Sequence, residues 1–168
     1  MTEQEIRTIL NRQREYFATG ATLSRKFRAE QLGKLKASLQ RHEEELNAAL
    51  QQDLGKSRME SYMCEIGLTL SELTWMQKHL RGLMQEKRVP TPLSQFAAIS
   101  FRSPSPYGTV LIMSPWNYPV LLTLDPLIDA IAAGNTAVVK PSAYAPATAA
   151  VLKNILEECF PIEYVAVI

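Results

Sequence analysis

The fold of this chain is decided by residues 106–145, PYGTVLIMSPWNYPVLLTLDPLIDAIAAGNTAVVKPSAYA. Within this stretch, Thr109 to Met113 is a β-branched and aliphatic run bounded by a glycine and by a Ser-Pro pair. This run predicts a strand that is buried on both faces. Strands of that kind belong to parallel sheets, so the stretch predicts the start of a parallel sheet.

The residues that follow predict further elements of the same sheet. Pro119 can open a helix, whose apolar residues recur at three- and four-residue steps until Gly134-Asn135 stops it. Residues 136–140 then form a strand, residues 147–159 a helix, and residues 164–168 the start of a third strand. Successive strand–helix–strand units predict a doubly wound α/β sheet, in which ligands bind beyond the carboxyl ends of the strands.

Two polar side chains fall at that edge of the predicted sheet. Asn117 follows the first strand and Lys140 closes the second, so we expect both to face one crevice. From the pattern alone, Asn117 could equally cap the helix that opens at Pro119. Lys140 could equally be an exposed charge at the end of a strand.

The first half of the chain, residues 1–89, predicts a helical layer. Capping patterns and apolar stripes indicate helices within residues 2–19, 32–54 and 57–84. We interpret His42 as a buried or boundary histidine with a hydrogen-bonded neighbour, and the methionines of the last helix as core residues. The organisation changes near residues 88–94, within the proline-bearing KRVPTPLS. Residues 95–105 then predict an edge or projecting strand.

Composition and missing motifs limit the possible functions. The chain has 168 residues, 46% hydrophobic and 21% charged, with a net charge of +1, as expected of a soluble globular protein without a nucleic-acid or membrane partner. No stretch suits a signal peptide or a membrane span, so we expect a cytoplasmic protein in which Cys64 and Cys159 are free thiols. The glycines form neither G-x-G-x-x-G nor a P-loop, and no metal-binding or self-contained catalytic set is present.

The motifs PYGTVLIMSPWNYP and AIAAGNTAVVKPS, at this separation, resemble those of the aldehyde dehydrogenase superfamily, nearest its shorter, dimeric class-3-like members. The resemblance covers essentially the whole chain, including the DLGK motif at residues 53–56. It implies helices packed on a truncated, Rossmann-like sheet, that is, an incomplete NAD(P)-binding domain. Its parts would be residues 1–89, residues 95–105 and residues 106–168, without the catalytic domain.

The resemblance also implies a role for Asn117. In the family a cysteine thiolate attacks an aldehyde, and an asparagine amide together with the cysteine's own N–H holds the resulting oxyanion; Asn117 matches that asparagine. Such a donor contributes about 3–4 kcal/mol to transition-state stabilisation. Hydride passes to NAD(P)+, and a glutamate-activated water hydrolyses the thioester. The cysteine and the glutamate would lie beyond Ile168, and neither Cys64 nor Cys159 matches the nucleophile.

The resemblance further implies a cofactor site for NAD or NADP. Lys140 matches the family lysine that contacts the adenosine ribose or its 2′-phosphate, and residues 112–116 would line the adenosine side. The expected contacts are Ile112, Met113, Ser114, Trp116, Lys140 and Ser142. We interpret Trp116 mainly as a packing residue. Many members carry glutamate three residues after the lysine, where this chain has Ala143, and we therefore expect NADP+ to be tolerated beside NAD+.

The sequence leaves alternative functions open. The chain would be the N-terminal part of a homodimeric enzyme that oxidises an aldehyde to a carboxylic acid, and we expect the 168 residues alone to be inactive and poorly soluble. An alternative is a catalytically inactive nucleotide-binding or dimerisation module. A third is a helical interaction protein in which residues 1–87 bind a partner.

Overall fold

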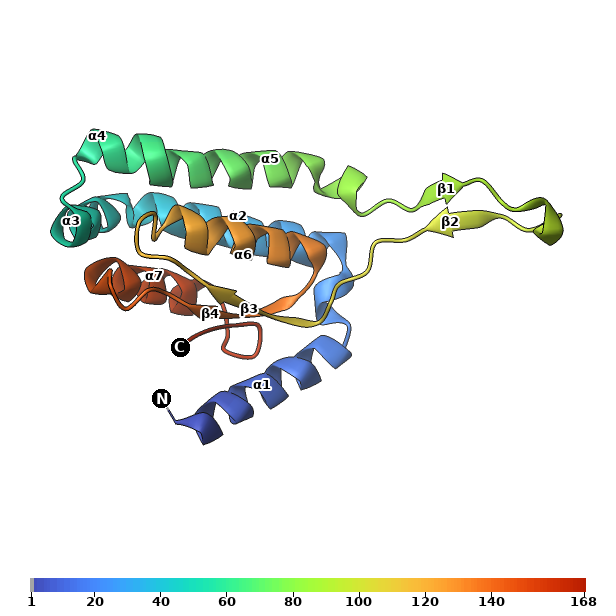
Figure 1. Cartoon of the computed structure of the whole chain (residues 1–168), viewed down its shortest axis with the longest axis horizontal. Helices are drawn as coiled ribbons and strands as arrows, with labels where there is room; N and C mark the ends of the chain where they lie inside the picture. The colour runs from blue at the N-terminus through green and yellow to red at the C-terminus, as the bar shows by residue number, and fades with distance from the viewer. Residues whose placement is uncertain (1) are drawn as a thin grey trace.

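Residues 2–168 are described by a computed structural model. Figure 1 shows a parallel sheet with most helices on one side and a single helix on the other, and a ribbon that projects from this body. The covering layer consists of α2 (Arg25–Arg41), α5 (Gly67–Leu83), α6 (Leu121–Ala133) and α7 (Pro146–Cys159). Helix α1 (Glu3–Ala18) crosses the opposite face, where it contacts strands of the sheet. The chain is thus a mixed α/β structure built on a parallel sheet, as predicted.

The sheet contains β3 (Thr109–Met113), β4 (Thr136–Lys140) and β5 (Val165–Val167), in that spatial order and all parallel. The bounds of the first two strands agree with the prediction. Met113 pairs with Lys140, so β3 and β4 end at the same edge. Gly134 takes a left-handed conformation, with φ of 91°, directly after α6, which confirms the predicted helix stop.

The expectation that β3 is buried on both faces is wrong for the described residues. Ile112 is only 8% exposed, but Leu111 and Met113, on the other face, are 58% and 68% exposed. Helix α1 contacts both β3 and β4 on this face, and the buried Gln13 side chain donates from Nε2 to the Ala137 carbonyl oxygen of β4 over 2.7 Å. The outer face of β3 is therefore only partly covered.

The second predicted helical stretch is two helices, not one. Helix α2 ends at Arg41, α3 spans Glu43–Leu54, and His42 separates them with ψ of 14°. The His42 ring contacts the carboxylates of Glu45 (3.2 Å) and Glu158 (2.8 Å), which confirms a boundary histidine with hydrogen-bonded neighbours. The hydrogen bond to Glu158 raises the pKa of His42.

The third stretch contains a π-helical turn, η2 (Tyr62–Ile66), between α4 (Arg58–Ser61) and α5. The prediction that its methionines lie in the core is wrong for Met59 and Met63, which are 75% and 62% exposed. A π turn adds a residue to the helical repeat and rotates the stripe that precedes it away from the core. After Glu65 the buried apolar residues of the helix are Ile66, Leu73, Met76 and Leu80.

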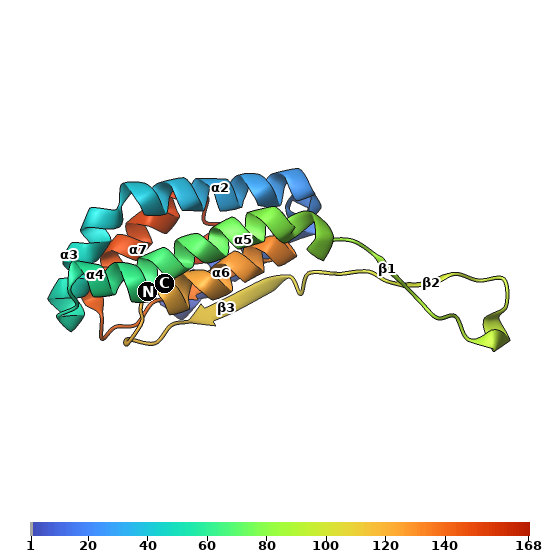
Figure 2. The same cartoon turned by 90° about the horizontal axis from the view of Figure 1, so that it is seen from above.

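A two-stranded ribbon extends away from the helices and the sheet (Figure 2). It pairs β1 (Lys87–Val89) with β2 (Ser100–Arg102) in antiparallel register. The short 3-10 helix η3 (Leu93–Gln95) lies at its tip, and a similar turn, η1 (Ala21–Leu23), joins α1 to α2. The ribbon contacts little else in the described chain, so the core lies between the sheet and the helical layer.

Candidate active site at the carboxyl edge of the sheet

The loops after β3 and β4 meet at the carboxyl edge of the sheet, as the sequence predicted. The Ser114 N–H donates to the Lys140 carbonyl oxygen over 3.1 Å, which extends the pairing of the two strands into their loops. The Ser114 hydroxyl oxygen is buried and has no hydrogen-bond partner among residues 2–168. A buried oxygen without a partner at a ligand-binding edge suits a polar ligand group.

Asn117 lies on the loop between β3 and α6 and is exposed. It does not cap the helix: α6 begins at Leu121, and its cap position, Val120, has no side-chain acceptor. The acceptor comes from Glu65, whose Oε2 receives the N–H groups of Val120 (2.7 Å) and Leu121 (3.3 Å). The capping interpretation of Asn117 is therefore wrong, and its amide is left available to a ligand.

A buried ion pair holds the backbone of this loop. Glu65 is fully buried, and its Oε1 receives the Lys56 ammonium over 2.5 Å. Lys56 also donates to the main-chain carbonyl oxygen of Asn117 over 3.0 Å. The same ammonium lies 4.2 Å from the centre of the Tyr118 ring, within the range of a cation–π contact. Residues 117–121 are thus tied to two side chains of the helical layer.

The loop after β4 borders a hollow of about 650 Å³ above β5 and the start of α7. Lys140, Ser142, Ala143 and Lys153 are among its lining residues, which include two lysines and no carboxylate. The Ser142 hydroxyl accepts the Tyr144 N–H over 3.2 Å, which fixes the turn. A hollow of this size with two cations can accept the phosphate-bearing part of a nucleotide.

The N-terminus of α7 is held in the same way as that of α6. Its cap position, Ala145, has no side-chain acceptor. The carboxylate of Asp53, at the end of α3, instead accepts the N–H groups of Ala147 (3.1 Å) and Thr148 (2.7 Å). Both sheet helices that begin at the candidate site are therefore capped by carboxylates from the helical layer.

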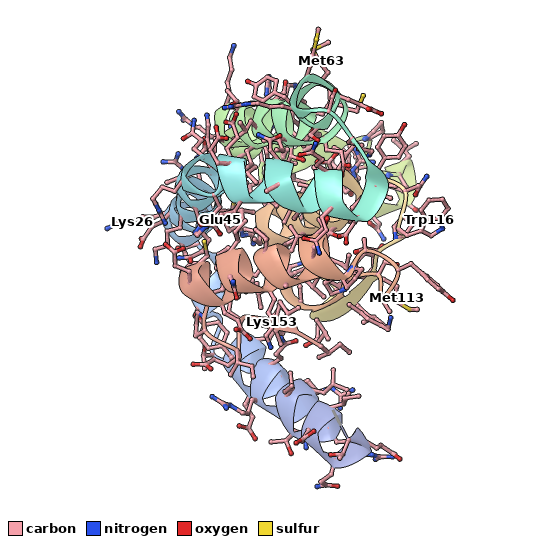
Figure 3. The ribbon with its side chains drawn as sticks, turned by 90° about the vertical axis from the view of Figure 1, so that its left-hand side faces the viewer. Lys26, Glu45, Met63, Met113, Trp116 and Lys153 are labelled. Atoms are coloured by element: carbon pink, nitrogen blue, oxygen red, sulfur yellow. The ribbon has the colours of Figure 1, made fainter. Side chains whose placement is uncertain are left out.

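The other predicted cofactor contacts differ in accessibility. Ile112 is 8% exposed and can offer only its main chain to a ligand. Met113 and Trp116, which is 55% exposed, project from the same side of the molecule (Figure 3). Trp116 is therefore not a core residue among the described residues, contrary to the packing interpretation.

Sequence reasoning missed Asp53, Lys56 and Glu65 as parts of the site. A signal was present, because neither α6 nor α7 carries Ser, Thr, Asp or Asn at its cap position. Two helix starts without caps require acceptors from elsewhere in the fold. The polar loop Asp53-Leu-Gly-Lys56 was the nearest unexplained source.

Other groups in the described residues offer less chemistry. Cys64 and Cys159 are free thiols, as predicted, and burial raises the pKa of Cys159, which disfavours its thiolate. Residues 2–168 contain no cluster of His, Cys, Asp or Glu arranged for a metal ion. A hollow of about 750 Å³ between α1 and β3 is larger than the one beside Lys140. Among the described residues that line it, the titratable side chains are Arg14 and Tyr107. None of the helices in the described part has the length and apolar character of a membrane span.

Comparison with known proteins identifies relatives for the whole chain. A family model described as "Aldehyde dehydrogenase family" matches residues 1–168. The chain is 44% identical to a 4,4'-diaponeurosporen-aldehyde dehydrogenase of Staphylococcus aureus over 91% of its own length and 33% of that protein. It is 40% identical to the aldehyde dehydrogenase family 3 member H1 of Arabidopsis thaliana, over 92% of its own length and 32% of that protein. The chain thus spans about a third of the length of these relatives.

Solved structures show the same fold. One described as the substrate-bound state of Staphylococcus aureus AldH matches with a TM-score of 0.95 and 42% identity, over 97% of this chain and 36% of that one. A succinic semialdehyde dehydrogenase of Streptococcus pyogenes, in complex with NADP+, matches with a TM-score of 0.86 at only 18% identity. The match covers 100% of this chain and 36% of that one. The second likeness concerns the fold alone.

Proposed function

Because this chain belongs to the aldehyde dehydrogenase family, we propose that it is the N-terminal part of an NAD(P)+-dependent enzyme that oxidises an aldehyde to a carboxylic acid. The observation that carries the proposal is the loop of Asn117, whose backbone is fixed while its amide stays exposed at the carboxyl edge of the sheet. An amide in that place can donate to an oxyanion without first breaking a bond inside the chain.

In this proposal the aldehyde oxygen becomes an oxyanion when a cysteine thiolate attacks the carbonyl carbon. The Asn117 amide donates one hydrogen bond to it, and because the loop is already ordered, little reorganisation accompanies the charge. The cysteine and the general-base glutamate would come from residues that follow this chain in a longer polypeptide. Cys159 does not suit the nucleophile's role, since burial raises its pKa.

NAD(P)+ would supply the hydride acceptor, and residues of this chain fit its adenosine end. The support is the hollow beside Lys140, together with the unpartnered Ser114 hydroxyl. Lys140 would contact the ribose hydroxyls or a 2′-phosphate, Ser142 would shape the turn, and residues 112–116 would offer mainly backbone groups. Met113 and Trp116 are exposed beside this loop and would flank the ligand.

We further propose that NADP+ is accepted as well as NAD+. Ala143 places no carboxylate in the hollow, where Lys140 and Lys153 both lie, and none of the described side chains that line it would repel a 2′-phosphate. Lys153 is partly neutralised by Glu157, at 3.1 Å, so Lys140 is the main cation. Kinetics at matched concentrations should give comparable kcat/KM for both cofactors, and a strong preference for NAD+ would contradict this proposal.

The activity is tested by comparing two polypeptides. The downstream coding sequence should encode a cysteine and a glutamate in later motifs, and the longer product should reduce NAD(P)+ when an aldehyde is added. The 168-residue chain is the matched control and should be inactive. Turnover by the control would refute the division of the active site, and an inactive longer product would favour a non-catalytic nucleotide-binding or dimerisation module.

A further inference from the structure

We propose that Lys56 and Glu65 are positioning residues for Asn117, acting through the backbone of residues 117–121. The inference rests on the proposed role of the Asn117 amide as an oxyanion donor. It assigns no contact with substrate or cofactor to either residue. Their task is to hold the peptide unit from which the amide projects.

The contacts of Lys56 are the first argument. An ammonium has three donors, and here one meets Glu65 (2.5 Å), one meets the Asn117 carbonyl oxygen (3.0 Å), and the Tyr118 ring occupies the remaining side (4.2 Å to its centre). Two of the three receivers belong to consecutive residues of the candidate site. The side chain of Lys56 is only 9% exposed, so water does not compete for these bonds.

The contacts of Glu65 fix the other end of the same segment. One of its oxygens binds Lys56, and the other accepts the N–H groups of Val120 and Leu121. A single buried ion pair therefore hydrogen-bonds to the loop on both sides of Pro119, at residue 117 and at residues 120–121. The rotation of the Asn117 backbone is restricted from both ends.

The backbone around Glu65 has an unusual conformation that fits this role. Glu65 lies in the π-helical turn Tyr62–Ile66, and π turns recur at functional positions. A side chain at Gly67 would place its Cβ 2.7 Å from the Tyr62 carbonyl oxygen, so the turn requires a glycine there.

Stability alone does not account for the pair. Moving two charges out of water costs about as much as their attraction returns, and apolar replacements of buried ion pairs are often neutral. This pair contributes little net stability, but it hydrogen-bonds to three main-chain groups of the loop. Its effect is therefore to hold the loop in one conformation. This places its effect on the orientation of Asn117.

The test uses the longer polypeptide proposed above and the double variant Lys56→Met/Glu65→Gln. Glutamine keeps an oxygen for Val120 and Leu121, while methionine removes the bond to the Asn117 carbonyl without leaving a buried charge. We expect kcat to fall at least tenfold, with the KM for NAD(P)+ within twofold. The control Lys34→Met/Glu30→Gln removes an exposed pair of α2, at 3.4 Å, and should change neither.

A double-mutant cycle separates positioning from general weakening. In an Asn117→Ala background, the same double variant should lower kcat less than threefold further, because the group that it positions is gone. A full additional tenfold loss would show that the pair does not act through Asn117. The proposal would also be overturned if Asn117→Ala alone lowers kcat strongly but the Lys56→Met/Glu65→Gln variant of the wild-type polypeptide loses less than twofold in kcat.

Amide hydrogen exchange provides a readout without activity. Exchange of the Val120 and Leu121 amides, which donate to Glu65, should accelerate at least tenfold in the double variant, because glutamine is a weaker acceptor and is no longer held by Lys56, and it should remain unchanged in the control. If the wild-type polypeptide oxidises no aldehyde, the proposed function fails, while this measurement still decides whether the pair fixes the loop. If the double variant does not fold, Glu65→Gln alone replaces it, and an exchange rate equal to that of the wild type refutes the proposal.

Discussion

Gly134→Ala is expected to destabilise the chain far more than an ordinary glycine substitution, because two effects meet there. Gly134 has φ of 91°, and an added Cβ would clash with Nη2 of Arg28. Arg28 is 6% exposed and donates to the carbonyl oxygens of Thr22 and Ala132, each over 2.9 Å. The methyl group would therefore displace a buried guanidinium that joins the helical layer to the end of α6.

Gly55 provides a matched control. It has φ of 68°, but an added Cβ there meets nothing within 4 Å. Left-handed backbone costs an alanine about 1–2 kcal/mol, which is the whole cost expected for Gly55→Ala. Losing one charged hydrogen bond of Arg28 adds about 1.5–3 kcal/mol. Gly134→Ala should therefore cost about 4 kcal/mol in total, since both terms apply there.

Urea denaturation of both variants measures the difference. The free energy of unfolding should fall by roughly 2 kcal/mol or more further for Gly134→Ala than for Gly55→Ala. In an Arg28→Ala background the two substitutions should cost the same, because the obstructing group is gone. Equal costs in the wild-type background would refute the reasoning, since they would mean that Arg28 does not occupy the space above Gly134.

Two further predictions concern carboxylates. Asp53→Ala should lower the free energy of unfolding by about 2 kcal/mol in urea titrations, because α7 loses its charged cap, and a loss below about 0.5 kcal/mol would contradict this role. Burial, with smaller contributions from neighbouring carboxylates, raises the pKa of Asp125 to about 6 from 3.8 in the unfolded chain. The folded state then binds more protons between these values, so stability falls as the pH rises from about 4 to 6. Asp125→Asn should remove that fall and gain about 1 kcal/mol above pH 6, after allowance for solvent screening, but nothing below pH 4; an equal gain at both pH values would contradict it.

The strands and the helix stop were predictable because their signals are local. Thr109–Met113 and Thr136–Lys140 are β-branched and aliphatic runs with turn residues on both sides, and Gly134 satisfies the conformation that follows a helix end. The edge where Asn117 and Lys140 meet follows from the parallel order of the strands alone.

The missed features depend on contacts between distant segments. The pair of Lys56 and Glu65 meets a loop more than fifty residues later, and its geometry depends on a π turn that has no recognised sequence signal. The break at His42 lacks glycine or proline, and the apolar stripe continues across it because α2 and α3 both pack on α7. Periodicity reports the face that is buried and not the continuity of the helix.

The central claim is that Asn117 stabilises the oxyanion in aldehyde oxidation. Its most direct test is the kcat of Asn117→Ala in the longer polypeptide, with aldehyde and NAD(P)+ at saturation. Removing one preorganised oxyanion donor lowers kcat by a factor of about 10²–10³, and the KM for NAD(P)+ should stay within twofold. A kcat within fivefold of the wild type would contradict the account.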